Sequence, residues 1–131
     1  MKHNRFILAL ISIAILVLSV SIAFAEEYMP YSSGANSVQI SFKISDGVAT
    51  AIGNTTALAS GTSAKTTVYI QKLVDTTWKT IKTASGGSEA SASCSVESGE
   101  IYRGRVVGKI YNSAGEKVDE LSMNSKTKEA P

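Results

Sequence analysis

The sequence predicts an all-β fold, a small antiparallel β-sandwich of about seven strands preceded by an N-terminal signal helix. Apolar and polar residues alternate with a period of two over several short segments, as half-buried strands require. Turn residues separate these segments at intervals of about 8–12 residues. The apolar spacing of an amphipathic helix does not occur beyond the N-terminal segment.

Residues 1–25 are typical of a signal peptide. Lys2 and Arg5 make the start positive, residues 6–25 are apolar or small, and the segment ends in Ala-Phe-Ala, the A-x-A form of a cleavage site. An uncleaved anchor is the alternative, because roughly 20 apolar residues can span a bilayer. The acidic start at Glu26 favours cleavage after Ala25. We therefore expect a secreted, extracellular protein that does not stay in the membrane.

The mature chain is the length of a single domain and carries no net charge. Removing residues 1–25 from the 131 leaves 106, close to the ~100 residues of a single β-sandwich domain. Lys2 and Arg5 leave with the signal, so 11 of the 13 basic residues remain against 11 acidic ones. A neutral chain without a basic run argues against nucleic acid and against electrostatic membrane binding.

The first predicted hairpin follows an extended lead-in over residues 26–36. Residues 37–45 place an apolar side chain at every second position, which predicts a strand with one apolar face. Asp46 and Gly47 form a two-residue turn signal, because glycine tolerates the positive φ that such turns need. Residues 48–56 return as the second strand.

The central hairpin is predicted over residues 66–83, after a small and polar loop at residues 58–64. Its two strands meet at an Asp-Thr-Thr turn, and the second contains Trp78, the only tryptophan. Trp78 and Ile81 are three residues apart and so point to opposite sides of a regular strand. Only one of them can face the core unless the strand bulges.

Three more strands are predicted over residues 89–96, 101–111 and 116–124, with turns that contain Gly99 and Gly115. The sandwich domain is thus assigned to residues 37–125. Residues 126–131 are predicted to be a frayed polar tail.

Cys94 is the only cysteine, so the chain has no intrachain disulfide. The alternation of its strand places it on the inward face, which favours a small buried apolar residue. Pairing with another chain, or a free thiol, stays open for an exported protein. The oligomeric state is equally open: a monomer, or a dimer through an edge strand or Cys94.

Two segments resemble fibronectin type III and related immunoglobulin-like domains. VYIQKLVDTTWKTIKT resembles the central hairpin of that fold, and IYRGRVVGKIYNSAGEKVDELS resembles its last hairpin. The resemblance implies that Tyr102 is the corner tyrosine, whose hydroxyl returns to nearby backbone. Trp78 departs from it, because these domains keep their core tryptophan in another strand. The mature chain is also similar to small secreted proteins of Gram-positive bacteria, of a family whose function is uncharacterised.

Catalytic chemistry finds little support in the sequence, and we predict no catalytic, cofactor-binding or metal-binding residue. The single histidine, His3, lies in the predicted signal, which removes the usual base of serine and cysteine hydrolases and the commonest metal ligand. Ser125 and Lys128 match S-x-x-K, but in a predicted polar tail with nothing to desolvate the lysine. The acidic residues available for glycoside hydrolysis or calcium are predicted in turns and an edge strand: Glu97, Glu100, Glu116, Asp119 and Glu120.

We therefore expect a non-catalytic interaction or structural module whose partner is an extracellular protein or glycan. The alternative is a carbohydrate-binding module that uses surface aromatics, because tryptophan and tyrosine faces stack on sugars and anchor interfaces. An antibacterial peptide is a weaker third hypothesis, since a neutral chain is poorly suited to membrane attack. The candidate contact residues are Trp78, Tyr69 and Tyr111, with Tyr28 and Tyr31 as further aromatics.

Overall fold

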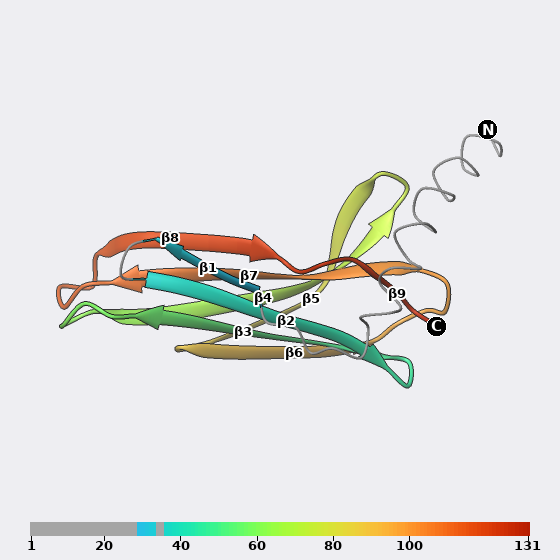
Figure 1. Cartoon of the computed structure of the whole chain (residues 1–131), viewed down its shortest axis with the longest axis horizontal. Coiled ribbons are helices and arrows are strands. Elements are labelled where there is room, and N and C mark those ends of the chain that lie inside the picture. The colour runs from blue at the N-terminus through green and yellow to red at the C-terminus, as the bar shows by residue number, and fades with distance from the viewer. Residues whose placement is uncertain (1–28, 34–35) are drawn as a thin grey trace.

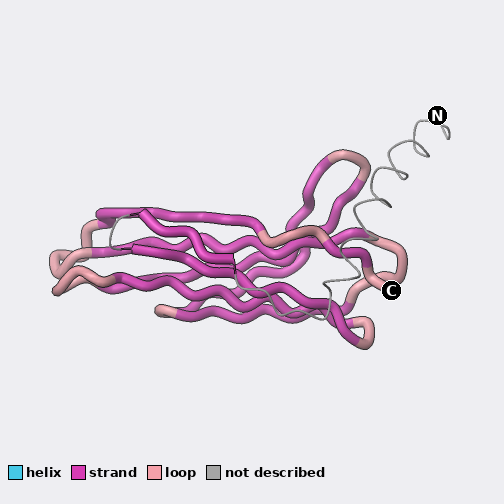
Figure 2. Tube along the Cα trace, in the orientation of Figure 1, coloured by secondary structure: helices cyan, strands magenta, loops and turns pink. Residues whose placement is uncertain are grey.

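A computed structural model describes residues 29–33 and 36–131. This part of the chain forms strands, turns and loops and contains no helix (Figure 2), so it has no helical segment of the length and hydropathy that a membrane span requires. The predicted signal helix and its cleavage site, Ala25 and Glu26, lie outside the described residues. The strands are β1 (Met29–Ser33), β2 (Asn36–Ser45), β3 (Val48–Ala57), β4 (Ser63–Val74), β5 (Thr77–Gly86), β6 (Glu89–Ser95), β7 (Ile101–Tyr111), β8 (Lys117–Asn124) and β9 (Lys128–Glu129).

The strands form two antiparallel sheets packed face to face (Figure 1). The first sheet has the order β1-β2-β3-β6, and the second has the order β5-β4-β7-β8, with β9 also paired to β7. Strand order and the two-layer arrangement are compatible with an immunoglobulin-like or fibronectin type III-like sandwich, as the sequence predicted. The all-β prediction is confirmed for the described residues.

The β2–β3 hairpin shows how the alternating sequence sets the fold. Asp46 and Gly47 have φ values of 53° and 75°, as in a type I′ turn, whose twist matches that of the flanking strands. The register runs from Ser45 opposite Val48 to Asn36 opposite Ala57 without a slip. Because the side-chain period is two, this register directs every second residue of β2 towards the second sheet.

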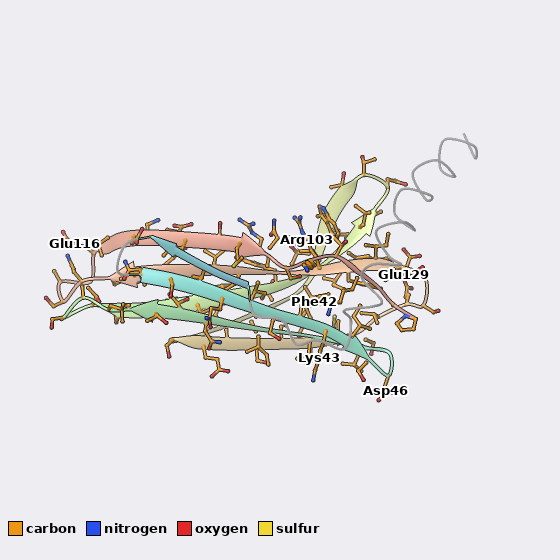
Figure 3. The ribbon with its side chains drawn as sticks, viewed as in Figure 1. Phe42, Lys43, Asp46, Arg103, Glu116 and Glu129 are labelled. Carbon is orange, nitrogen blue, oxygen red and sulfur yellow. The ribbon has the colours of Figure 1, made fainter. Side chains whose placement is uncertain are left out.

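The core lies between the two sheets and draws on most of the strands. Its largest fully buried side chains include Tyr102, Ile40, Ile70 and Ile110. Phe42 projects between the layers (Figure 3) and is also buried. One polar pair is enclosed, because Thr66 Oγ1 donates a hydrogen bond of 2.7 Å to Thr55 Oγ1. This bond satisfies two hydroxyls that would otherwise be costly to bury.

Tyr102 occupies the corner position that the resemblance implied. Its ring is fully buried at the start of β7, and its hydroxyl accepts a 2.8 Å hydrogen bond from the backbone N–H of Glu97. The bond spans the β6–β7 connection and ties it to the core. The predicted tyrosine corner is therefore present in the structure.

Both ends of the domain are more ordered than predicted. The lead-in contains β1, which pairs with β2, and residues 126–131 contain β9. Ala130 is only 2% exposed, and its backbone pairs with Gly99 and Glu100. The prediction of a frayed polar tail is thus wrong. Backbone groups at and just before the start of β7 hydrogen-bond to the tail and hold it in place. The polar composition of residues 126–131 did not indicate this pairing.

Candidate functional site

Trp78 lies on the outer face of the second sheet, near the tip of the β4–β5 hairpin. It pairs in register with Leu73, and its side chain is half-buried. The guanidinium carbon of Arg103 lies 4.2 Å from the centroid of its ring. This is a cation–π contact, in which the positive charge is attracted to the negative face of the indole. The two residues therefore form one unit on the surface of the sheet.

A β-bulge explains why Trp78 and Ile81 do not compete for the core. Ile70 pairs with Lys82 and Gln71 pairs with Thr80, so Ile81 is an extra residue on β5. The extra residue reverses which positions of β5 face inward and which face outward on its two sides. Ile81 itself is 38% exposed. Neither Trp78 nor Ile81 belongs to the buried core, which resolves the conflict seen in the sequence.

A chain of side-chain hydrogen bonds holds Arg103 in place. Its Nε donates to Gln71 Oε1 over 2.8 Å, and Gln71 Nε2 donates to Thr80 Oγ1 over 3.1 Å. The hydrogen bonds join β7 to β4 and β4 to β5 across the sheet. Burial, and then the neighbouring charge of Arg105, lower the pKa of Arg103 from its ordinary value. The side chain nevertheless stays a cation at physiological pH, because an arginine pKa lies far above 7.

Basic residues gather on the same outer face. Since Tyr102 and Val106 point inward, the alternation of β7 directs Arg103, Arg105 and Lys109 outward. The register adds one lysine from β4 and one from β8, opposite Lys109 and Tyr111 respectively. We call this surface the basic face and define its cations as Lys65, Arg103, Arg105, Lys109 and Lys117.

Among the described residues, one carboxylate offsets these charges. Glu120 pairs in register with Lys109, and its carboxylate lies 2.6 Å from Lys117 Nζ. The hydrogen bond and the charge of Lys117, followed by the charge of Lys109, lower the pKa of Glu120. Arg105 instead donates to Asn124 Oδ1 over 2.9 Å, so both arginines bond to neutral amides. Figure 3 shows Arg103 on this face and Lys43 on the opposite side of the molecule.

Two of the three predicted contact aromatics lie close to the arginines. Tyr69 is half-buried on the outer face and pairs in register with Arg105. Tyr111 ends β7 at the other end of the sheet and pairs with Ser63 and Lys117. Tyr31 lies in β1, opposite Val38, and Tyr28 lies outside the described residues. The structure therefore brings Trp78 and Tyr69 to one region and leaves Tyr111 apart.

Four of the five acidic residues considered for catalysis or calcium, all except Glu100, are engaged in structural contacts. Glu97 forms an ion pair with Lys72, and Asp119 accepts a 2.8 Å hydrogen bond from Asn36 Nδ2. Glu116 accepts a 3.0 Å bond from Asn112 Nδ2 at the β7–β8 turn. The described residues contain no group of three or more histidine, cysteine or acidic side chains that could hold a metal ion.

Ser125 and Lys128, the S-x-x-K pair, lie in a different environment from the solvated tail that was predicted for them. Lys128 is only 7% exposed, because β9 packs beside the start of β7, so the expectation of an undesolvated lysine is wrong. Ser125 Oγ accepts a 2.8 Å hydrogen bond from the Gly104 N–H and donates to the Lys126 carbonyl over 2.9 Å. Its proton is therefore directed at a backbone carbonyl, and the hydroxyl has a structural role at the end of β8.

Cys94 is half-buried in β6, opposite Ala49 of β3. Burial raises the pKa of its thiol, and the nearby charge of Lys82 lowers it by a smaller amount. A raised pKa keeps the sulfur protonated and poorly nucleophilic at neutral pH. This environment is the one expected of a packed cysteine.

Sequence reasoning missed the polar residues that fix the arginines. Gln71, Thr80 and Asn124 lie on three different strands, and only the strand register brings them beside Arg103 and Arg105. The alternation of β7 already placed both arginines on one face. The three-residue spacing of Trp78 and Ile81 allowed for a bulge, but the sequence did not show that it lies at Ile81 and brings Trp78 to that face.

Comparison with known proteins assigns the chain to no family. No protein-family model matches the chain, and no curated protein matches it. Solved structures do match, among them a β-glucuronidase from Ruminococcus gnavus in complex with N1-substituted uronic isofagomine. That chain is 11% identical with a TM-score of 0.40, and the match covers 66% of this chain and 14% of that one. The chain thus spans a small part of that protein's length.

Proposed function

We propose that this chain is an exported, non-catalytic interaction module that binds an extracellular partner through its basic face. The observation that carries the proposal is the Trp78–Arg103–Gln71 cluster. An aromatic ring and a cation, both held by packing and hydrogen bonds on an outward face, are the groups that anchor interfaces. Export rests on the signal-like residues 1–25, with their positive start, apolar stretch and Ala-Phe-Ala end.

The non-catalytic role is supported by the side chains of the mature chain. Histidine is absent after residue 25, and the acidic residues are spread over separate ion pairs and hydrogen bonds. A general base needs a reactive group within hydrogen-bond reach. Ser125 and Cys94, the nucleophiles considered, are respectively hydrogen-bonded to backbone and protonated in a packed site.

The proposal is tested by measuring binding of the chain beginning at Glu26 to extracellular polysaccharides and proteins on an array. We expect at least one partner whose affinity falls about tenfold when Trp78→Ala removes an anchor side chain. Lys43→Ala, on the opposite face, is the control and should leave that affinity unchanged. Partners that bind both variants equally would place the interaction elsewhere and refute the use of this face.

A carbohydrate-binding module is the second candidate, favoured by Trp78 and Tyr69 on the same face. Because Arg103 covers one side of the indole, a sugar would stack on Tyr69 or on the remaining surface of Trp78. Soluble glycans that bind there should quench the fluorescence of the single tryptophan. Complete protection of Trp78 from acrylamide would remove this candidate.

A further inference from the structure

We propose that the partner of the basic face is a linear acidic polysaccharide whose carboxylates bind Arg103 and Arg105. This inference rests on the proposed function and adds the chemical class of the partner. The mature chain is neutral as a whole, yet the basic face carries five cations and one paired carboxylate among the described residues. A surface of this charge is complementary to a polyanion.

The cations lie in a line that suits an extended polymer. Arg103 and Arg105 are two positions apart on one strand, which separates them by roughly 7 Å, and Lys109 lies about 20 Å from Arg103 at the rise of an antiparallel strand. Lys65 pairs in register with Lys109 and widens that end of the line. A chain molecule with repeated charges can contact all of these positions together, whereas a single small anion can contact only one end.

Arg103 is prepared for a carboxylate before any ligand arrives. The bond to Gln71 uses Nε, and the guanidinium plane is held against Trp78, so the terminal nitrogens keep a defined direction. A guanidinium binds a carboxylate through two parallel N–H···O bonds, and a fixed guanidinium loses less entropy when it does so. Arg105, held by Asn124, offers a second such group.

The surface around the cations favours a sugar polymer over an acidic peptide. Apart from Val107, which lies between Arg105 and Lys109, it carries hydroxyl and amide groups that match sugar hydroxyls: Thr67, Gln71, Thr80, Ser85, Ser122 and Asn124. An extended peptide binds a sheet edge through its backbone, or places side chains in apolar pockets. The basic face is instead the flat surface of a sheet whose backbone groups already pair with neighbouring strands.

Titration of the chain beginning at Glu26 with oligogalacturonate, followed by Trp78 fluorescence, tests the inference. Neutral galactan oligomers of the same length are the uncharged comparison. We expect oligogalacturonate to change the emission and to bind at least tenfold more tightly than galactan, with affinity falling as salt rises. The double substitution Arg103→Gln and Arg105→Gln should weaken binding about 100-fold, because two charge-assisted contacts are lost.

The matched control is the double substitution Lys43→Gln and Lys82→Gln, which removes the same charge away from the basic face. It should bind like the unchanged chain. A second pair, Lys65→Gln and Lys109→Gln, leaves the Trp78–Arg103 contact and the hydrogen bonds of Arg103 intact, so a loss of binding there cannot come from a disturbed cluster. Circular dichroism and urea unfolding establish that each variant is folded.

Five outcomes would overturn the inference, and the last of them would overturn the proposed function as well. One is equal binding of oligogalacturonate and galactan, and another is equal loss of binding in the control pair and the arginine pair. The third is tighter binding of a sulfated polymer or single-stranded DNA at the same charge and salt, which would mean a response to charge alone. A neutral partner bound through Trp78 would end this inference and leave the proposed function standing. If no polysaccharide or protein on the array bound the chain, both this inference and the proposed function would be refuted.

Discussion

Gly108 lies at a close approach of the two sheets. A Cβ atom built on it would lie 2.6 Å from Val38 Cγ1 and would also overlap the side chain of Thr55. Gly53, on the facing sheet, is equally tight, with Val68 Cγ1 at 2.5 Å from its would-be Cβ. At these two positions the absence of a side chain lets the sheets meet around the Thr55–Thr66 hydrogen bond.

Gly108→Ala should therefore destabilise the fold. Overpacking a core of this kind costs about 1–3 kcal/mol, because neighbouring side chains must leave their preferred rotamers. Urea unfolding followed by circular dichroism measures the change. Gly87→Ala is the control, since nothing lies within 4 Å of its would-be Cβ. Equal stability of the two variants would contradict the close approach of the sheets.

Tyr102→Phe should lower stability without altering the fold. The change removes the acceptor of the 2.8 Å bond from the Glu97 N–H and leaves a partly buried donor unpaired, which costs about 1–3 kcal/mol. Chemical denaturation measures the loss. Tyr69→Phe serves as the comparison, because it removes a hydroxyl from the outer face, where water can replace it. If Tyr102→Phe left the stability unchanged, water would be replacing the tyrosine hydroxyl as the acceptor for the Glu97 N–H.

The central strands follow from the sequence because one of their faces is buried. Alternation fixes which residues of β2, β3, β4 and β7 face inward, and the Asp46-Gly47 turn fixes the first register. β1 and β9 could not be predicted in the same way. They are short, and they form because neighbouring strands offer unpaired backbone groups, which only the assembled sheets reveal.

The candidate site was predictable only in part, for a related reason. The alternation of β7 placed Arg103 and Arg105 together, whereas the position of Trp78 depends on a bulge at Ile81. A bulge shifts the parity of every residue beyond it. No local residue type marks this one, so its effect appears only when β5 is paired with β4.

Deleting residues 126–131 should destabilise the domain, although these residues are mostly polar. The deletion removes the backbone bonds of Ala130 with Gly99 and Glu100, together with the pairing of β9. At about 1 kcal/mol for each hydrogen bond, the loss is about 2 kcal/mol or more. Thermal unfolding provides the measurement, and deletion of Pro131 alone is the control. An unchanged melting temperature would mean that residues 126–131 do not stabilise the domain, as expected of a frayed tail.

The whole molecule is neutral in its predicted mature form but uneven in the distribution of its charge. Five cations lie on the outer face of one sheet with one carboxylate, that of Glu120, while other acidic residues lie in turns and on other surfaces. Overall neutrality argued against nucleic acid and against electrostatic membrane binding when only the composition was considered. The sheet register gathers basic residues on one face. That face can therefore attract a polyanion although the net charge of the molecule is zero.

Export is the prediction that belongs to the full chain. We expect the secreted protein to begin at Glu26, because Ala23-Phe24-Ala25 has the form that signal peptidase reads. N-terminal sequencing of protein from the culture medium checks the site. Detection of the intact chain from Met1 in the membrane fraction would instead establish the uncleaved anchor.

The β4–β5 hairpin has a further consequence for motion. Its tip rises away from the two packed layers (Figure 1), so residues 73–78 form a two-stranded ribbon without a second sheet behind it. Such ribbons open locally far more often than a packed core does. Their amide hydrogens should exchange with deuterium within minutes while those of Val68 and Ile70 stay protected. A partner held by Arg103 and Trp78 would slow that exchange, so the tip should become rigid on binding.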